Sequence, residues 1–207
     1  AKITVPVDGY NSLWDPALAD SIVMMDDARN VIGMTLKSLG YSMNSTDSGE
    51  LAEASAKLME LQPNIRALNY DSPQSLLISG EASVGYIFTS QIVATLADRP
   101  EMEVVYPKEG LGFGIDAIFV PAKAPHPTNA GKFINFILDG QRGAEISDAI
   151  GYICTNQAAE SYLSEEYKAN PAFNIPQAAL ENNEMIQDIG AEATEEYNKI
   201  WLAFKQQ

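Results

Sequence analysis

The stretch Ser21–Leu36, which reads SIVMMDDARNVIGMTL, joins a short apolar run to a helical pattern through two adjacent acids. The unbroken apolar run Ile22–Met25 is typical of a strand that is covered on both faces. Beyond the acids, apolar residues recur along one stripe of a helix that ends at Gly40, where a left-handed cap is expected. The stretch therefore predicts one strand–helix unit of a parallel sheet.

The same order of strand and then helix recurs along the rest of the chain. Alternation of this kind predicts an α/β fold with a largely parallel sheet flanked by helices. The last helix is expected to pack the side chains of Tyr197, Ile200, Trp201 and Phe204. Further strands are expected over 64–69, 82–88, 102–107 and 112–121, and further helices over 47–62, 72–80, 91–97, 129–138 and 143–151.

Composition restricts the classes of function. The 207 residues include 13 basic and 28 acidic side chains, for a formal charge of −15. Such a field repels nucleic acid and attracts cations, so no nucleic-acid partner is expected. Cys154 is the single cysteine, which excludes an intrachain disulfide and a cysteine-based metal cluster. The single histidine, His126, lies in a Pro-rich turn and is interpreted as a solvated turn residue. We expect no metal and no cofactor.

Three polar or aromatic features follow or interrupt predicted strands, where ligands of parallel sheets gather. They are the doublet Asp26-Asp27, the turn around Phe88, and Asp116 inside an apolar strand. Asp27 suits a helix N-cap, and adjacent strand residues point to opposite faces, so the doublet is no acid–base pair. A binding site for a cation at this doublet remains an alternative. A buried Asp116 carboxylate would need a positively charged partner, which is either a Lys or Arg of the protein or a ligand ammonium. Tyr152, taken alone, is interpreted as a half-buried core residue.

Several stretches together, in this order and spacing, are similar to one known family. They are residues 12–54, from SLWDPALADSIVMMDD to GELAEA, with GEASVGYIF, IDAIFVP, NAGKFINFIL and IGYICTNQAA. Over nearly its whole length the chain resembles the spermidine/putrescine-binding proteins of bacterial ABC polyamine importers. The resemblance implies a periplasmic-binding-protein-like fold of type II, in which two lobes close on a polyamine outside the cytoplasm. The closed form then docks on a membrane permease.

The resemblance also implies a division of the chain into lobes. Family members are longer, and most of their first lobe has no counterpart here. Residues 1–114 and 156–207 are expected to belong to the second lobe, with 156–207 as its helical C-terminal segment. Residues 115–155 are expected to be the returning part of an incomplete first lobe. On this view the chain is a C-terminal portion or the tail of a larger polypeptide, such as a permease–receptor fusion. Uncovered apolar faces around Phe133, Ile134, Phe136 and Ile137 then predict self-association of the isolated chain.

Four positions of the family's binding site carry over with their chemistry retained at least in part. Asp27 matches an acid that binds an amine at the end of its strand. Asp116 matches the acid that pairs with an amine at the centre of the cleft, and Tyr152 matches a cleft tyrosine. Phe88 stands where the polyamine binders have a tryptophan. An ammonium beside carboxylates and over an aromatic face is stabilised by both charge and cation–π attraction.

Three positions depart from the family pattern. Asn30 replaces a glutamate, which removes one negative charge from the site, and Gly114 replaces a second tryptophan. Ile186 occupies the position of a glutamine, which a one-residue shift to Gln187 would restore. The residues therefore support the cationic end of a ligand better than its length, and a shorter diamine or another cationic amine fits as well as spermidine.

Three rival functions remain at the level of the sequence. The first is a receptor of the same fold for a solute that is not a polyamine. The second is an Asp-dependent hydrolase using Asp27 and Asp116, although a catalytic base, a nucleophile motif and a metal constellation are missing from the pattern. We therefore expect no enzymatic activity. The third is an interaction domain that binds no small molecule.

Overall fold

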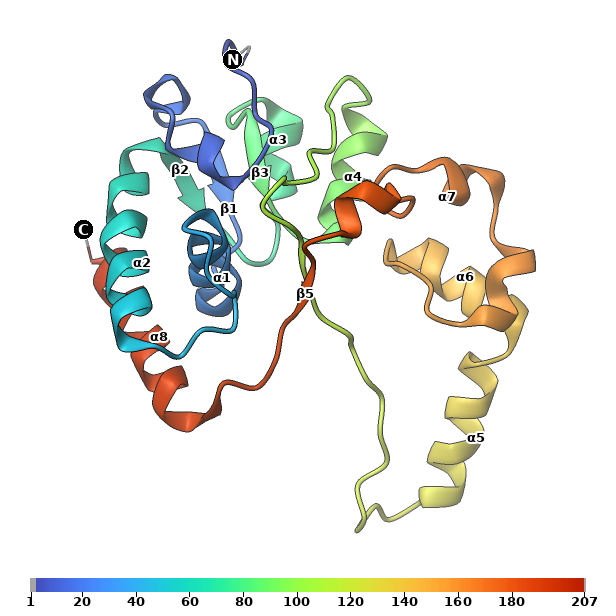
Figure 1. Cartoon of the computed structure of the whole chain (residues 1–207). Coiled ribbons are helices and arrows are strands. Elements are labelled where there is room, and N and C mark those ends of the chain that lie inside the picture. Colours follow the sequence, from blue (N-terminus) through green and yellow to red (C-terminus); the bar gives the residue numbers. More distant parts are fainter. Residues whose placement is uncertain (1–2, 207) are drawn as a thin grey trace. The chain divides into compact units, whose positions relative to one another are not determined.

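The computed structural model describes residues 3–206, which form two compact units (Figure 1). The first unit holds the residues up to Gly114 together with those from Ile175 onward. The second unit runs from Ile115 to Asn174. Residues 156–174, which we expected in the second lobe, thus lie in the same compact unit as 115–155. The assignment of either unit to a lobe of a longer protein stays a prediction.

A parallel sheet of three strands forms the centre of the first unit. Its strands are β1 (Ile22–Met24), β2 (Ile65–Leu68) and β3 (Val84–Tyr86), in the order β2-β1-β3. The central strand β1 is wholly buried, as its unbroken apolar run predicts. The predicted strands 64–69 and 82–88 are confirmed, although each is shorter than expected.

Helices cover both faces of this sheet. Side chains of β1 point alternately to the two faces, and they pack into a different hydrophobic cluster on each face. Ile22 and Met24 join the larger cluster, with side chains of helices α1, α2 and α8, whereas Val23 joins a smaller cluster with Leu77 and Ile87. Figure 1 shows α2 and α8 next to α1, and α3 and α4 near β3. The helices of the first unit are α1 (Ala28–Ser38), α2 (Ser48–Leu61), α3 (Gln74–Ser79), α4 (Thr89–Asp98) and α8 (Gly190–Lys205).

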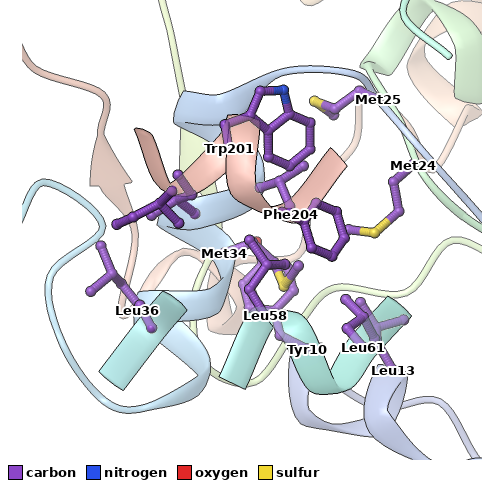
Figure 2. Close-up of a cluster of buried hydrophobic side chains, with 14 of the residues drawn as sticks. Tyr10, Leu13, Met24, Met25, Met34, Leu36, Leu58, Leu61, Trp201 and Phe204 are labelled. Carbon is purple, nitrogen blue, oxygen red and sulfur yellow. The ribbon is translucent and has the colours of Figure 1, made fainter. Parts of the chain in front are cut away.

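The C-terminal helix α8 completes the larger cluster. Tyr197, Ile200, Trp201 and Phe204 are all buried, as the helical stripe predicts. Figure 2 shows Trp201 and Phe204 among the methionines of β1 and α1 and the leucines of α2. Burial of these large side chains contributes on the order of 1.5–3 kcal/mol each, so α8 is an integral part of the fold despite its distance in sequence.

Two short strands, β4 (Gly112–Phe113) and β5 (Glu184–Met185), form a second parallel ladder in the first unit. The segments that lead into β4 and β5 approach each other closely at Gly110, whose φ is +98°. A Cβ at this position would overlap the carbonyl oxygen of Asn182, so only glycine fits. The predicted strand 112–121 is wrong beyond Phe113, where the strand ends. The predicted strand 102–107 is not formed. The reason is that a strand needs a hydrogen-bonded neighbour, and among the described residues only 112–113 of these segments has one.

The second unit is built from helices α5 (Pro127–Ile137), α6 (Gly140–Ile150) and α7 (Glu165–Ala169). The two longer helices confirm the predictions over 129–138 and 143–151. A 3-10 helix at Gln157–Tyr162 packs closely on α6, where Gly140 and Gly143 leave room for it. Further 3-10 helices, all in the first unit, lie at Tyr10–Trp14, Pro16–Leu18, Gln62–Asn64 and Gln177–Leu180. In the described part of the chain, no helix combines the length and apolarity that crossing a membrane requires.

Candidate functional site

The carboxyl edge of the sheet collects acidic and aromatic residues from all three strands. Tyr70 follows β2, Asp26 and Asp27 follow β1, and Phe88 follows β3. Because the strands are parallel, their carboxyl ends meet at one edge, which is where open α/β sheets bind ligands. This edge is the candidate site of the first unit.

Main-chain hydrogen bonds hold the three chain segments together beyond the last strand residues. The N–H of Met25 donates to the carbonyl of Tyr86 at 2.9 Å, and the N–H of Asn69 donates to the carbonyl of Met24 at 2.9 Å. The segments that leave the three strands are therefore anchored to one another, and the residues that follow start from fixed positions.

Asp27 is the N-cap of α1, as its place before the helix predicts. Its Oδ1 accepts hydrogen bonds from the backbone N–H of Asn30 at 2.7 Å and from the Asn30 side-chain amide at 2.9 Å. Among residues 3–206 no hydrogen bond to Oδ2 of Asp27 is found. One carboxylate oxygen is thus engaged in capping, and the other has capacity to accept from a ligand.

Asp26, in contrast, is committed to the packing of α8. Its carboxylate accepts hydrogen bonds from Lys205 Nζ at 2.8 and 2.6 Å and from Trp201 Nε1 at 3.1 Å. The two neighbouring acids point in different directions, as residues at the end of a strand do. Asp26 therefore has a structural role, in which it links the end of β1 to α8.

Tyr86 lies beneath the N-terminal turn of α1 and was missed by the sequence analysis. Its hydroxyl donates to the carbonyl of Asn30 at 3.4 Å. Burial raises the pKa of Tyr86 well above 10, and the neighbouring Tyr10 and the negative charge of Asp27 raise it further. The phenol therefore stays neutral and supports the helix start that carries Asp27. Its sequence signal is its position as the last residue of β3.

Phe88 precedes α4 and pairs with an aromatic residue that the sequence analysis also missed. Its ring meets the ring of Tyr70 edge to face, with centroids 5.6 Å apart and an interplanar angle of 73°. The signal for Tyr70 was its place two residues after β2, equivalent to the place of Asp26 after β1. The two rings form an aromatic corner at the candidate site.

Gln187 is exposed, and its backbone is held in place by α1 and the segment that follows it. Its N–H donates to Asn44 Oδ1 at 2.9 Å, and its carbonyl accepts from the Arg29 guanidinium at 3.4 Å. The preceding residue, Ile186, is half-buried and its N–H donates to the carbonyl of Phe113 at 2.8 Å. No hydrogen bond of the Gln187 side chain is found in the part of the chain that the structure describes.

Asp116 and Tyr152 belong to the second unit. Asp116 is exposed in a segment without regular structure, so the expectation of an acid inside a buried strand is wrong. The physical reason is that no neighbouring strand pairs with residues 115–121 among those described. Gly114, at the end of the first unit, has open space around it where a side chain would project.

Tyr152 is also exposed, which corrects its interpretation as a core residue. It follows the left-handed Gly151 at the end of α6. Its backbone is fixed by Tyr167, whose hydroxyl donates to the Tyr152 carbonyl at 2.8 Å and accepts from the Cys154 N–H at 2.7 Å. The Tyr167 ring in turn stacks on Phe173 with centroids 4.1 Å apart. Tyr167 thus positions the segment that presents Tyr152.

The structure therefore brings Asp27 and Asn30 into direct contact, and it places Phe88 at the same sheet edge. Asp116 and Tyr152 lie in the second unit, each exposed. The first-unit site offers one carboxylate oxygen, amide groups and two aromatic rings. Such a set is suited to recognition of a cationic group with an apolar stem.

Comparison with known proteins agrees with this architecture. Residues 1–175 match the family model described as bacterial extracellular solute-binding protein. The chain is 39% identical over 195 residues to the spermidine/putrescine-binding periplasmic protein of Escherichia coli, covering 92% of this chain and 56% of that protein. It is 27% identical over 215 residues to the putrescine/cadaverine-binding protein of Pseudomonas aeruginosa, covering 99% of this chain and 60% of that protein.

Solved structures show the same fold. A protein of Listeria monocytogenes, 31% identical, superposes with a TM-score of 0.88 over 98% of this chain and 62% of its own length. A spermidine/putrescine ABC transporter substrate-binding protein of Streptococcus pneumoniae, 29% identical, gives a TM-score of 0.83 over 99% of this chain and 63% of its own.

These likenesses confirm the predicted α/β fold of the periplasmic-binding-protein type. The chain spans between 56% and 63% of the length of these relatives. With more than half of its residues matched by the family model, the chain belongs to the family of bacterial extracellular solute-binding proteins.

Proposed function

We propose that the chain is part of the solute-binding component of a bacterial ABC importer, and that this component binds a polyamine or a similar cationic amine. Delivery of the amine to a membrane permease, outside the cytoplasm, follows from the same proposal. The family description and the names of the relatives, which are periplasmic binding proteins for spermidine, putrescine or cadaverine, support it.

The observation that carries the proposal is the state of the Asp27 carboxylate. One oxygen caps α1 and the other accepts no hydrogen bond from the described residues, at a sheet edge lined by aromatic rings. A carboxylate oxygen beside the rings suits an ammonium group, which donates up to three hydrogen bonds and is attracted to ring faces. The chain's formal charge of −15 adds a long-range attraction for cations.

Each of the two units contains proposed ligand residues. Asp27, Phe88, Asn30 and Gln187 are the candidates of the first unit. In the second unit the candidates are Asp116 and Tyr152, of which the tyrosine is held by the hydroxyl of Tyr167.

The ligand is proposed to be short or of low charge. The Asn30 side chain donates its amide to Asp27 and brings no charge of its own, where the family resemblance implies a glutamate. Gly114 likewise brings no aromatic ring to its position. A diamine such as putrescine or cadaverine needs fewer acidic partners than spermidine does.

Two alternatives are weaker. A receptor for a solute that is not an amine would leave Oδ2 of Asp27, the carboxylate oxygen that does not cap α1, without a cationic partner. A hydrolase would need its acids for proton transfer, whereas Asp26 is tied to Lys205 and Trp201 and Asp27 caps a helix. The relatives named above are solute-binding proteins, and we propose that this chain has no enzymatic role.

The test is calorimetric titration with putrescine, cadaverine and spermidine. The amines are titrated into the chain and into a version extended upstream to the length of the relatives, because the chain spans only part of their length. We expect micromolar or tighter binding by the extended version. Asp27→Asn and Asp116→Asn should each weaken it by about 1.5–3 kcal/mol, roughly 10- to 150-fold, the range for hydrogen bonds to charged groups.

Asp26→Asn is the matched control, because it removes the same charge from the adjacent residue and leaves the candidate ligands in place. Its affinity should stay within about twofold of the wild type if only the long-range field changes. Equal loss in the Asp26 and Asp27 variants would mean that general charge, not a site, holds the amine. Unchanged affinity in both the Asp27 and the Asp116 variant would refute the proposed site.

A further inference from the structure

Tyr70 is a large aromatic residue that the structure leaves exposed at the candidate site. The exposed fraction of its surface is 53%, although it lies only two residues after the sheet strand β2. Exposure of such a ring is common at recognition surfaces, where aromatic residues supply contact area with few rotatable bonds. The family resemblance assigned no role to Tyr70, and its position at the sheet edge follows from the fold.

The rings of Tyr70 and Phe88 meet across the end of the central strand. β2 and β3 lie on opposite sides of β1, so their backbones are separated by roughly 10 Å, twice the usual spacing of neighbouring strands. The ring centroids are nevertheless only 5.6 Å apart. The two side chains must therefore lean toward each other beyond the end of β1, where the chain continues into Asp26 and Asp27.

Gln91 holds both members of this pair by their backbones. Its side-chain Nε2 donates to the carbonyl of Tyr70 at 3.0 Å, and its Oε1 accepts from the N–H of Phe88 at 2.9 Å. Gln91 itself is buried, so this bridge is shielded from water. A buried amide satisfied at both ends fixes the two backbones, and the rings start from a restricted set of positions before any ligand arrives.

The chemistry of this corner selects a particular kind of cation. Ring faces carry partial negative charge and attract an ammonium, and the same faces pack against methylene groups. A carboxylate oxygen of Asp27 lies at the same sheet edge. A small hydrated metal ion would gain little from the rings, whereas an alkylammonium would use both the rings and the acid.

We propose that Tyr70 is a specificity-determining residue of the amine site, and that its ring completes with Phe88 the wall that receives the alkyl stem of an aliphatic diamine. This inference rests on the proposed amine-binding function and assigns it a further residue. Gln91 acts as a positioning residue, because it touches the backbones of the wall and its amide is already satisfied by them.

The experiment compares Tyr70→Ala, Tyr70→Phe and the control Tyr162→Ala in the extended protein, titrated with putrescine and cadaverine. Tyr162 is a tyrosine of similar exposure, 58%, in the second unit. Tyr70→Ala should weaken binding roughly 3- to 30-fold, the range of a cation–π contact with partial desolvation. Tyr70→Phe should stay within about twofold, because the ring and not the hydroxyl forms the wall.

A double-mutant cycle with Phe88→Ala tests whether the two rings act as one wall. If they do, the second deletion costs less in the absence of the first ring than in its presence, so the two effects are not additive. Strictly additive losses would overturn the single wall formed by Tyr70 and Phe88. A Tyr70→Ala protein with wild-type affinity, while Asp27→Asn is impaired, would overturn the role of Tyr70 and leave amine binding intact. Failure of the wild type to bind any amine would instead remove the proposed function and this inference with it.

Discussion

At the scale of single residues, the doublet Asp26-Asp27 shows how one strand end serves two purposes. Asp26 turns toward α8 and binds Lys205 and Trp201, and Asp27 turns toward the first turn of α1. The alternation of side-chain direction along a strand separates the two carboxylates, so neither interferes with the other's hydrogen bonds. The stability role and the proposed binding role can be tested separately for this reason.

We predict that Asp26→Ala lowers the free energy of unfolding by about 1–3 kcal/mol, because the buried Trp201 N–H loses its acceptor. Asp26→Asn keeps an acceptor for that N–H and loses only the partly exposed ion pair with Lys205, so its cost should be about 1 kcal/mol or less. Urea unfolding followed by tryptophan fluorescence measures both. Equal costs for the two variants would show that the indole hydrogen bond is not the main contribution.

At the scale of elements, the ladder of β4 and β5 is fastened to α1 by a buried ion pair. The Lys37 side chain is only 8% exposed, and its Nζ lies 2.8 Å from Glu184 Oε1 and 2.8 Å from the carbonyl of Asn182. Ser42 donates a further hydrogen bond to Glu184. Segments that are far apart in sequence are thus joined at the point where the chain passes into the second unit after Gly114.

The pH dependence of stability should report this ion pair. Burial opposes ionisation of Glu184, but hydrogen bonds from Lys37 and Ser42 and the charge of Lys37 outweigh it and hold its pKa below the ordinary 4.5. As the pH falls below about 4.5, the unfolded chain therefore binds the proton before the folded chain does. The stabilising contribution of Glu184 is complete above that pH and is lost as the pH falls through the lower pKa of the folded state.

We predict that Glu184→Gln lowers the free energy of unfolding at neutral pH by about 1–3 kcal/mol, since Lys37 keeps its charge without its partner. The difference between variant and wild type should shrink as the pH falls from neutral to about 3. Denaturant titrations at several pH values measure it. Glu192→Gln, an exposed substitution on α8 with the same change of charge, is the control. A difference from wild type that stays constant with pH would contradict the proposed role of the ion pair.

At the scale of the whole molecule, the first unit contains nearly all of the buried hydrophobic core, and the second unit exposes much of its apolar surface. Phe119 is 78% exposed, and Ile115, Ile118, Phe133 and Phe136 are each more than half exposed. Helix α5 has no buried residue although one side of it is apolar. Exposed large apolar side chains in this number promote association in water.

We predict that the chain by itself self-associates at high concentration through this surface. The double variant Phe133→Ser/Phe136→Ser should shift the equilibrium toward the monomer, because it removes two large apolar side chains that are already in water. Sedimentation velocity over a range of concentrations measures the shift. Leu202→Ser on α8, an equally exposed apolar residue of the first unit, should leave the equilibrium unchanged. A wild-type chain that stays monomeric at every concentration would contradict the prediction.

The elements that depend on local pattern could be predicted from the sequence alone. The apolar run of β1, the stripes and caps of α1 and α2, the glycine ends of α3 and α6, and the buried stripe of α8 were all predictable. Each depends on side-chain period and on backbone groups a few residues apart. The N-cap role of Asp27 belongs to the same class. The strand pattern also singled out Asp116 and the turn around Phe88 as candidate positions. The ligand roles of Asp116, Tyr152, Asn30, Phe88 and Gln187 came from family resemblance and remain predictions.

Features that need a partner distant in the chain could be found only in the folded structure. Residues 102–107 and 114–121 have strand-like composition but form no strand, because a ladder is made by two segments and composition describes one. Asp26 meets Lys205 at a separation of 179 residues, and Tyr70 meets Phe88 because β2 and β3 flank β1 and end at the same edge of the sheet. Such contacts cannot be predicted from the local sequence, because they follow from strand order and packing.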